Sequence, residues 1–344
     1  DIRDRLRGRQ PTLADTAGVQ HLPTRASAIR EPSVPRPTLL SINNYHYARG
    51  GAESVYLNQN RLFEAAGWRV VPFAMRHPRN LSDPMDRYFV EEVEFGSDYS
   101  LAEKVHRVPR VVYSWEARQK LSALLEDCTP DVCHLHNIYH HISPSILSLL
   151  RQRSVPTVMT LHDLKIACPS YKMYTHDGVC ERCKGGRHRN LLKHRCIKGS
   201  LALSSLIYLE TKVHQFLGSY ARNVNRFVAP SRFLLEKMVE WGVDRSSLVY
   251  LPNAVPMSAY VAPDHVGDAF VYIGRLTLDK GVGPLIRAGA AAGVPLRVVG
   301  TGPDEDALKA LAGSSGSSVE FTGYLSGSEL RDAVRSARAL VLPS

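Results

Sequence analysis

Short apolar runs alternate along this chain with segments in which apolar residues recur every three or four positions. Apolar runs of about 4–8 residues between loop residues are typical of buried strands, and the longer period is typical of helices packed on a sheet. In the first part of the chain we expect strands at residues 38–43, 68–73, 131–136, 155–161, 226–229 and 248–251. We expect helices after the glycine pair Gly50-Gly51, at about 145–153, at 200–218 and at 231–241, with Ser231 as an N-cap.

The same alternation resumes after a polar, proline-containing stretch. The strands expected there are residues 269–273, 296–299, 319–322 and 339–342, with helices from about Gly283, after Pro303 and from Ser328. Strands that alternate with helices predict parallel sheets covered on both faces. We therefore predict an α/β fold of two doubly wound Rossmann-like domains facing a cleft. The predicted parts are a flexible extension (1–36), an N-terminal domain (37–252) with a cysteine-rich insertion (164–199), a linker (253–268) and a partial C-terminal domain (269–344).

The composition fits this fold class, and the positive net charge suggests an anionic partner. The 344 residues suit two domains, and 44% hydrophobic with 22% charged residues is typical of soluble proteins. No run approaches the roughly 18 apolar residues of a membrane span, and no secretory signal opens the chain, so we expect a cytoplasmic protein. A net charge of +10 indicates nucleotide phosphates, a lipid-linked phosphate, a membrane surface or nucleic acid as partner. A protein that is simply basic is the competing interpretation.

Two loops of the second domain suggest a phosphate site. Gly274-Arg275 follows an expected strand and Lys280-Gly281 precedes the next helix, so two cations lie beside a helix N-terminus, an arrangement that suits a diphosphate. Gly300 and Gly302 follow the next strand, where glycine lets the backbone approach a ligand closely. Each motif alone is weak, and a tight turn with solvated cations is the structural alternative.

Together, seven motifs in this order resemble the retaining GT-B glycosyltransferases of family 4 (glycosyl transferases group 1), from Leu39 to Ser344. They are residues 49–53 (RGGAE), 130–137 (PDVCHLHN), 160–163 (TLHD), 229–231 (APS), 252–253 (PN), 274–281 (GR with KG) and 300–302 (GTG). The resemblance implies a hexosyltransferase-type enzyme of polysaccharide biosynthesis that moves a sugar from a nucleotide-diphospho-sugar to a polysaccharide or lipid-linked glycan with retention. It also implies a second domain that is truncated here, because the family continues beyond this point into a helix with two glutamates that hold the donor.

The resemblance also assigns roles to residues. Arg275 and Lys280 hold the diphosphate and stabilise its charge as it leaves, and His162 lies near the transferring sugar; these three form the expected catalytic set, with no catalytic metal. The expected donor-binding residues are Gly50, Gly51, Gly274, Arg275, Lys280, Gly300 and Gly302. The expected acceptor-side residues are Glu53, His136, Asn137 and Asp163, with Asp163 also orienting His162. A structural histidine is the alternative for His162, and packing is the alternative for His134, His136, His140 and His141.

The cysteine-rich insertion predicts a metal site. Cys168, Cys180, Cys183 and Cys196 form a C-x11-C-x2-C-x12-C pattern, the soft ligand set of tetrahedral structural zinc. Such a site would fold a segment with few apolar residues, and a subset of family 4 carries a similar cluster. Free thiols or disulfides remain the alternatives. Cys128 and Cys133 lie outside the pattern and are expected in the core.

Seven cations interleave with these cysteines and indicate an anionic acceptor or peripheral contact with the inner membrane face. They are Arg182, Lys184, Arg187, Arg189, Lys193, Arg195 and Lys198. Three other functions compete: a nucleotide-sugar epimerase of similar fold, a non-catalytic truncated remnant, and a basic zinc-containing nucleic-acid-binding protein. The last lacks the ligand spacing and recognition helix of a DNA-binding finger, so nucleic acid is not an expected partner.

Overall fold

A computed structural model describes residues 36–92, 109–175, 178–255 and 265–343. The chain divides into two compact units, Asp1–Tyr250 and Leu251–Ser344. The expected flexible extension, apart from Arg36, lies outside the described residues, as do residues 256–264 of the expected linker and residues 176–177 of the insertion.

The first unit is built on a six-stranded parallel sheet. Its strand order is β2-β1-β3-β4-β7-β8, so the direction of winding reverses at β1, as in a doubly wound fold. The strands are β1 (Thr38–Ile42), β2 (Arg69–Phe73), β3 (Val132–Leu135), β4 (Thr157–Thr160), β7 (Arg226–Ala229) and β8 (Leu248–Tyr250). Each coincides with an expected strand to within a few residues. The α/β prediction is therefore confirmed for this unit.

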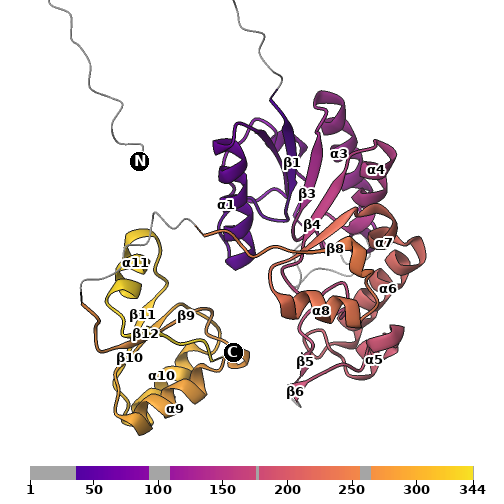
Figure 1. Ribbon diagram of the computed structural model, residues 1–344. Helices are drawn as coiled ribbons and strands as arrows, with labels where there is room; N and C mark the ends of the chain where they lie inside the picture. The colour runs from indigo at the N-terminus through magenta and orange to yellow at the C-terminus, as the bar shows by residue number, and fades with distance from the viewer. Residues whose placement is uncertain (1–35, 93–108, 176–177, 256–264, 344) are drawn as a thin grey trace, which may run out of the picture. The chain divides into compact units, whose positions relative to one another are not determined.

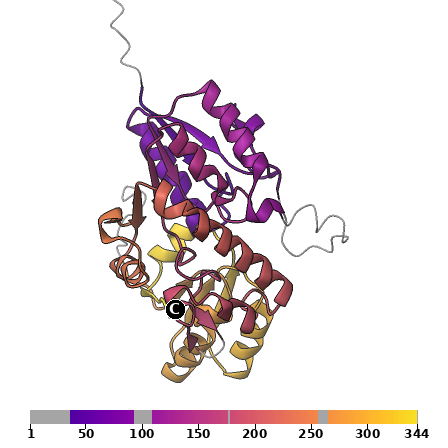
Figure 2. The same cartoon turned by 90° about the vertical axis from the view of Figure 1, so that its right-hand side faces the viewer.

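Helices cover the two faces of this sheet, with α1 on one side and α3 and α4 on the other (Figures 1 and 2). The helices are α1 (Gly51–Ala65), α3 (Trp115–Asp127), α4 (Leu147–Gln152), α6 (Leu201–Leu217), α7 (Ser219–Asn223) and α8 (Arg232–Glu240). Short 3-10 turns are η1 (Asp86–Tyr88), η2 (Pro144–Ile146) and η4 (Arg245–Ser247).

Caps fix the ends of two of these helices. Ser200 Oγ accepts from Leu203 N at the start of α6, and Gly218 ends that helix in the left-handed conformation. Ser231 caps α8 by accepting from Leu234 N, as expected. The part of the chain that the structure describes has no helix both long and apolar enough to cross a bilayer.

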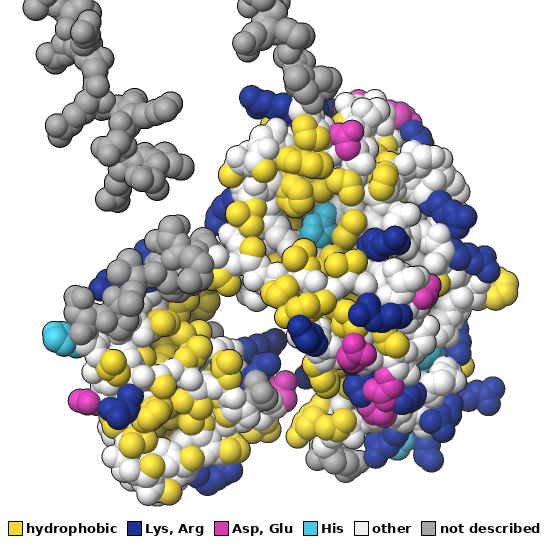
Figure 3. All heavy atoms as spheres, viewed as in Figure 1, with side chains coloured by type: hydrophobic (Ala, Val, Ile, Leu, Met, Phe, Trp, Pro, Cys, Tyr) yellow, Lys and Arg dark blue, Asp and Glu magenta, His cyan; other side chains and the backbone are white. Residues whose placement is uncertain are grey.

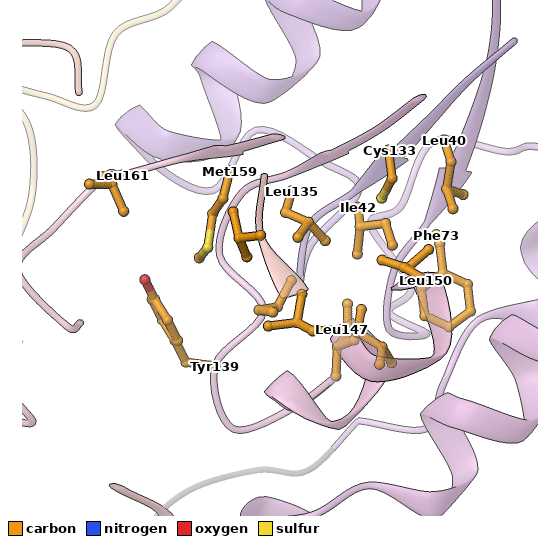
Figure 4. Packing of buried hydrophobic residues seen from close by; sticks show 14 of the residues in the cluster. Leu40, Ile42, Phe73, Cys133, Leu135, Tyr139, Leu147, Leu150, Met159 and Leu161 are labelled. Atoms are coloured by element: carbon orange, nitrogen blue, oxygen red, sulfur yellow. The ribbon is translucent and has the colours of Figure 1, made fainter. Parts of the chain in front are cut away.

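The core of the first unit lies between the sheet and the helices of one face (Figure 4). Leu40 and Ile42 of β1, Leu135 of β3 and Met159 of β4 are wholly buried, and Leu147 of α4 packs with them. Cys133 lies among these residues and Cys128 belongs to the same cluster, so the expected core positions of both thiols are confirmed. The carboxyl ends of these strands are thus held on a rigid base.

The insertion contains little regular structure. It forms a two-stranded hairpin, β5 (Tyr174–Thr175) and β6 (Gly178–Val179), followed by η3 (Lys184–Gly186) and α5 (Arg189–Lys193). Among its described residues, the buried large apolar side chains are Leu191 and Met173. The insertion therefore has little apolar core of its own.

The second unit is a smaller parallel sheet of four strands in the order β11-β10-β9-β12. Its strands are β9 (Phe270–Ile273), β10 (Leu296–Val299), β11 (Val319–Gly323) and β12 (Ala339–Leu340). Its helices are α9 (Val282–Ala292), α10 (Glu305–Ser314), α11 (Gly327–Arg335) and the 3-10 turn η6 (Leu278–Lys280). Tyr272 and Val298 pack with α9 and α10, whereas Val271 and Val299 pack with Ala333 of α11. Alternate residues of the strands thus face opposite helix layers, which makes this a second doubly wound unit.

Candidate functional site

Two histidines meet at the carboxyl ends of β3 and β4. His136 follows Leu135 and His162 follows Leu161, and the two strands are parallel neighbours, so both side chains are brought to one edge of the sheet. His136 Nδ1 lies 2.8 Å from His162 Nε2, and the rings stack with centroids 5.1 Å apart. His134 lies two residues earlier, in β3, and its Nε2 is 2.8 Å from Thr160 Oγ1.

All three imidazoles are neutral at pH 7. Burial lowers the pKa of His162 and of His134 to about 4, the latter with help from the nearby His162. Burial, followed by the proximity of His134 and His162, also places the pKa of His136 well below its usual value. His162 is therefore a neutral hydrogen-bonding group at this edge rather than a cation.

The partner of His162 differs from the expected one. Asp163 Oδ1 accepts from Lys165 N at 2.8 Å, which closes a turn within its own loop. Burial raises the pKa of Asp163, against the opposing effect of that hydrogen bond and of the nearby Lys165 and His140. The hydrogen bond recorded for the His162 ring goes to His136, and none joins that ring to Asp163 among the described residues.

A buried ion network anchors the loops that carry these residues. Lys165 Nζ lies 3.0 Å from Glu210 Oε2 of α6 and donates to Pro169 O, while His140 Nδ1 lies 3.2 Å from Glu210 Oε1. The sequence analysis missed Lys165 and Glu210. A signal was present, because Glu210 occupies the face of α6 that also carries the buried Ile207 and His214.

The start of α1 lies on the same unit; it is open at Gly51, whereas a Cβ on Gly50 would lie 3.3 Å from Glu53 Oε2. Gly50 is the extended N-cap residue, with no side-chain cap bond, and a Cβ placed on Gly51 would meet no atom within 4 Å. Glu53 in the first turn is buried. Tyr56, further along α1, contacts the His136 ring at 5.2 Å between centroids. The helix that begins at the glycine pair therefore also packs on His136.

Asn137 is held at the end of β1 by backbone contacts. Its N donates to Asn43 Oδ1 at 3.1 Å, and its O accepts from Asn44 N at 2.7 Å. Its side-chain Oδ1 is buried without a partner. Of the expected acceptor-side residues, His136, Asn137 and Asp163 thus all lie in loops that follow neighbouring strands of this sheet.

In the second unit, two loops are joined by hydrogen bonds. Leu276 N donates to Thr301 O at 3.0 Å, Asp304 N donates to Leu276 O at 3.2 Å, and Leu278 N donates to Asp304 Oδ2 at 2.8 Å. These bonds connect the loop after β9 to the loop after β10. The expected donor-binding loops therefore form one continuous surface.

Gly300 and Gly302 allow the close contact between these two loops. Gly300 has a φ of +133°, and a Cβ there would lie 2.0 Å from Gly274 O; a Cβ on Gly302 would lie 2.2 Å from Leu276 O. The close backbone approach expected toward a ligand is thus made toward the neighbouring loop of the same unit.

Two cations flank the start of α9. Arg275 is exposed, Lys280 is half-buried, and Gly281 takes the left-handed conformation that begins the helix. Within the described residues, the structure records no ion pair for the Arg275 guanidinium or the Lys280 ammonium. Uncompensated cations beside free helix N–H groups favour an anionic ligand.

The four cysteines of the insertion converge on one small cavity. Cys168, Cys180, Cys183 and Cys196 all line it, and its volume is about 10 Å³. Burial, and then the proximity of the other three thiols, raises the pKa of Cys183 to about 12. The room is that of about one water-sized sphere. Across the described ranges, no three His, Cys, Asp or Glu side chains are already set at positions that hold a metal ion.

Most of the cations of the insertion are exposed. Lysine and arginine side chains gather around α5 in the lower part of the first unit (Figure 3). Lys184 pairs with Glu240 of α8. The exposed cations are Arg182, Arg187, Arg189, Lys193, Arg195 and Lys198.

Comparison with known proteins agrees with this architecture. A model of the family described as Glycosyltransferase Family 4 matches residues 49–259, and one described as Glycosyl transferases group 1 matches residues 267–344. No curated protein matches the chain.

Solved structures of similar fold include the lipopolysaccharide outer core galactosyltransferase WaaB in its apo form, at 16% identity and a TM-score of 0.51, covering 89% of this chain and 74% of that one. They also include Anabaena HepE with UDP and glucose, at 13% identity and a TM-score of 0.52 over 89% and 73%. HepE with UDP alone gives 14% identity and a TM-score of 0.53 over 90% and 74%. At such identities the likeness concerns the fold, and the predicted GT-B class is confirmed.

Proposed function

The chain belongs to glycosyltransferase family 4, and from this membership we propose that it moves a hexose from a nucleotide-diphospho-sugar to a polysaccharide or lipid-linked glycan, with retention. The observation that supports the donor class is the pair of uncompensated cations, Arg275 and Lys280, at the start of α9. HepE, a protein of similar fold, has been captured with UDP, which makes UDP the first ligand to test.

The proposed chemistry is leaving-group stabilisation. Breaking the bond between the sugar and the diphosphate places negative charge on the departing oxygen. Arg275 is suited to bind the diphosphate as a planar fork and Lys280 as a point charge, and the N–H groups of α9 add a fixed positive potential. Groups already aimed at charge that develops in the transition state supply a large share of such rate enhancements.

The first unit is proposed to contribute the sugar and acceptor side. The start of α1 accommodates a phosphate of the donor beside Gly51, where a Cβ would meet no atom within 4 Å, while the Glu53 carboxylate lies beside Gly50. His162 is neutral and contacts the transferring sugar, while Glu53, Asn137 and Asp163 contribute to the acceptor side. These assignments follow the family resemblance and the positions of the residues at strand ends.

Binding and product analysis test the proposal. We expect Arg275→Ala and Lys280→Ala each to weaken UDP binding, measured by calorimetry, by about tenfold or more. Arg287→Ala removes the same charge from an exposed position on α9 and should leave binding unchanged. Nucleotide released with a new glycosidic bond supports the transferase, whereas an isomerised sugar without acceptor consumption would indicate an epimerase. UDP, GDP, ADP and dTDP that all bind no better to the parent chain than to the two variants would refute the donor site.

For the acceptor, we propose that the exposed cations around α5 contact an anionic membrane surface. Six of the seven cations of the insertion are exposed, and the seventh, Lys184, pairs with Glu240 of α8. Replacing Arg189, Lys193 and Arg195 with Gln should abolish binding to phosphatidylglycerol vesicles at low salt. Replacing three exposed cations of the second unit, Arg287, Arg335 and Arg338, is the matched control. Equal vesicle binding by both triple variants would contradict the proposal.

We also propose that the insertion holds structural zinc through its four cysteines. Zinc would supply a four-thiolate crosslink among the segments before β5, after β6 and after α5. The fit rests on the convergence of all four thiols on a cavity sized for one small ion. Burial, and then the proximity of the other three thiols, raises the pKa of Cys183, and a bound cation would oppose that rise.

A further inference from the structure

We propose that His136 donates its Nδ1–H to His162 Nε2 and thereby fixes His162 as the Nδ1–H tautomer, which presents a hydrogen-bond donor to the substrate. His136 is then a positioning residue. That His162 donates to a substrate rests on the proposed function, whereas the tautomer is a property of the chain alone.

The contact that carries the inference is short and enclosed. His136 Nδ1 and His162 Nε2 lie 2.8 Å apart, and their rings stack at an interplanar angle of 19°. His136 is wholly buried, with the edge of Tyr56 against its ring. The ring of His136 therefore has little freedom to turn away from His162.

Two neutral arrangements can place one proton between these nitrogens, and they differ in what remains at the other side of His136. If His162 were the donor, His136 would carry its own proton on Nε2. That nitrogen is buried and has no hydrogen-bond partner, so an N–H group would be orphaned. If His136 is the donor, Nε2 keeps only a lone pair.

Orphaned buried N–H groups are rarer in proteins than buried acceptors left unfilled. The adjacent Tyr56 ring offers at most a weak contact to an N–H group. The His134 ring lies close, at 4.4 Å between centroids, but its Nε2 is already engaged by Thr160. The second arrangement, with His136 as the donor, is therefore the favoured one.

The tautomer decides what His162 offers at the end of β4. With Nε2 occupied as an acceptor, its remaining polar atom is Nδ1–H. No protein partner of that atom is recorded in the described part of the chain, and it is not among the buried polar atoms that lack one. Nδ1–H is thus accessible, and it suits an acceptor oxygen such as a sugar hydroxyl.

Long-range proton–nitrogen NMR on histidine-labelled protein tests the tautomer directly. The His162 signals are assigned by their loss in His162→Asn. We expect a protonated Nδ1 and an unprotonated Nε2 at pH 7 for His162, and the same pattern for His136. A protonated Nε2 on His162 would overturn the proposal, whether or not the protein transfers sugar.

Variants of His136 test its positioning role. His136→Asn keeps an N–H donor near the position of Nδ1, whereas His136→Leu removes it. We expect the Nδ1–H form of His162 to persist with Asn and to be lost with Leu, and kcat to fall by about 10–100-fold with Leu and less with Asn. His134→Leu, which removes a buried imidazole from the same strand, should leave the His162 tautomer unchanged.

The outcomes separate this inference from the proposed function. The expected tautomer with no detectable sugar transfer would leave the His136–His162 assignment standing and count against the enzyme. Transfer activity with the opposite tautomer would refute the His136–His162 assignment and support the enzyme. If His136→Leu does not fold, the spectrum of the parent protein still decides the assignment.

Discussion

Lys165 and Glu210 form an ion pair inside the first unit, with Nζ and Oε2 3.0 Å apart and only 7% and 3% of their side chains exposed. Lys165 belongs to the loop after β4 that also carries His162, and Glu210 belongs to α6. The pair therefore fastens a loop of the candidate site to a helix that covers the sheet. His140 joins from the neighbouring loop, so a single carboxylate serves two loops.

Removing the charge of Glu210 should destabilise the first unit. Glu210→Gln leaves the buried Lys165 without its counter-charge, and breaking such a pair costs about 3–5 kcal/mol. Glu126→Gln is the matched control, because Glu126 is exposed and pairs with Arg153 at the surface; it should change stability by less than about 1 kcal/mol. Urea denaturation measures both. Similar losses in the two variants would show that the buried pair contributes nothing beyond a surface pair.

Acid should weaken the parent protein through the same carboxylate. Burial raises the pKa of Glu210, but His140 and Lys165 outweigh it and lower the pKa to about 2. A depressed carboxyl pKa gives stability that is complete above the unfolded value of about 4.3 and is lost as the pH falls toward 2. Denaturation curves across this range should therefore decline less steeply for Glu210→Gln than for the parent.

The buried histidines predict a second pH dependence at higher pH. The pKa values of His134 and His162 are about 4 in the folded chain, whereas unfolded histidine has a pKa of about 6.5. The unfolded state therefore binds more protons between these values, and the free energy of unfolding should fall as the pH drops from about 6.5 to 4. His134→Asn should reduce the slope near pH 5 by about 1.4 kcal/mol per pH unit.

Two glycines should respond in opposite ways to alanine. Gly51→Ala adds a methyl group into open space in the first turn of α1, so stability should be unchanged within about 0.5 kcal/mol while affinity for UDP falls. Gly300→Ala forces a methyl group against Gly274 O at a φ of +133°, and should destabilise the second unit by about 2 kcal/mol or more. Calorimetric melting and UDP titration separate the two effects. Full UDP affinity in Gly51→Ala would remove the α1 start from the donor site.

Metal analysis tests the cysteine cavity. Protein purified without chelator should contain about one zinc per chain, and Cys183→Ser should lose it. Cys133→Ser removes a buried thiol outside the cavity and should keep the metal. Chelation should expose the four thiols to a thiol reagent. A metal-free protein whose thiols react at once would exclude the zinc site.

The regular elements could be predicted from the sequence because local signals and tertiary packing agree. Strand β10 coincides with its apolar run, and α6 fills the expected range 200–218, with Ser200 and Gly218 as its caps. Helix α3 is not among the predicted elements although its signal is present: Ser114 caps it, and the buried Ala117, Leu121 and Leu124 recur at helical spacing.

The contacts within the candidate site could not be predicted in the same way. That His162 is bonded to His136 rather than oriented by Asp163 depends on the register of β3 against β4, which no local pattern records. The role of Gly300 likewise depends on how closely two loops approach each other. Sequence placed these residues at strand ends, and only the packing of neighbouring strands determines which of them touch.

The hydrogen-bonded loops of the second unit have a consequence for protein engineering. Because Asp304 holds the backbone at Leu278, and because Gly300 and Gly302 leave no room between the loops, neither loop has a shape independent of the other. If the arginine- and lysine-bearing loop alone were replaced by that of a relative, its backbone would not fit the loop after β10 of this chain. Residues 274–281 and 300–304 should therefore be exchanged together, as one cassette.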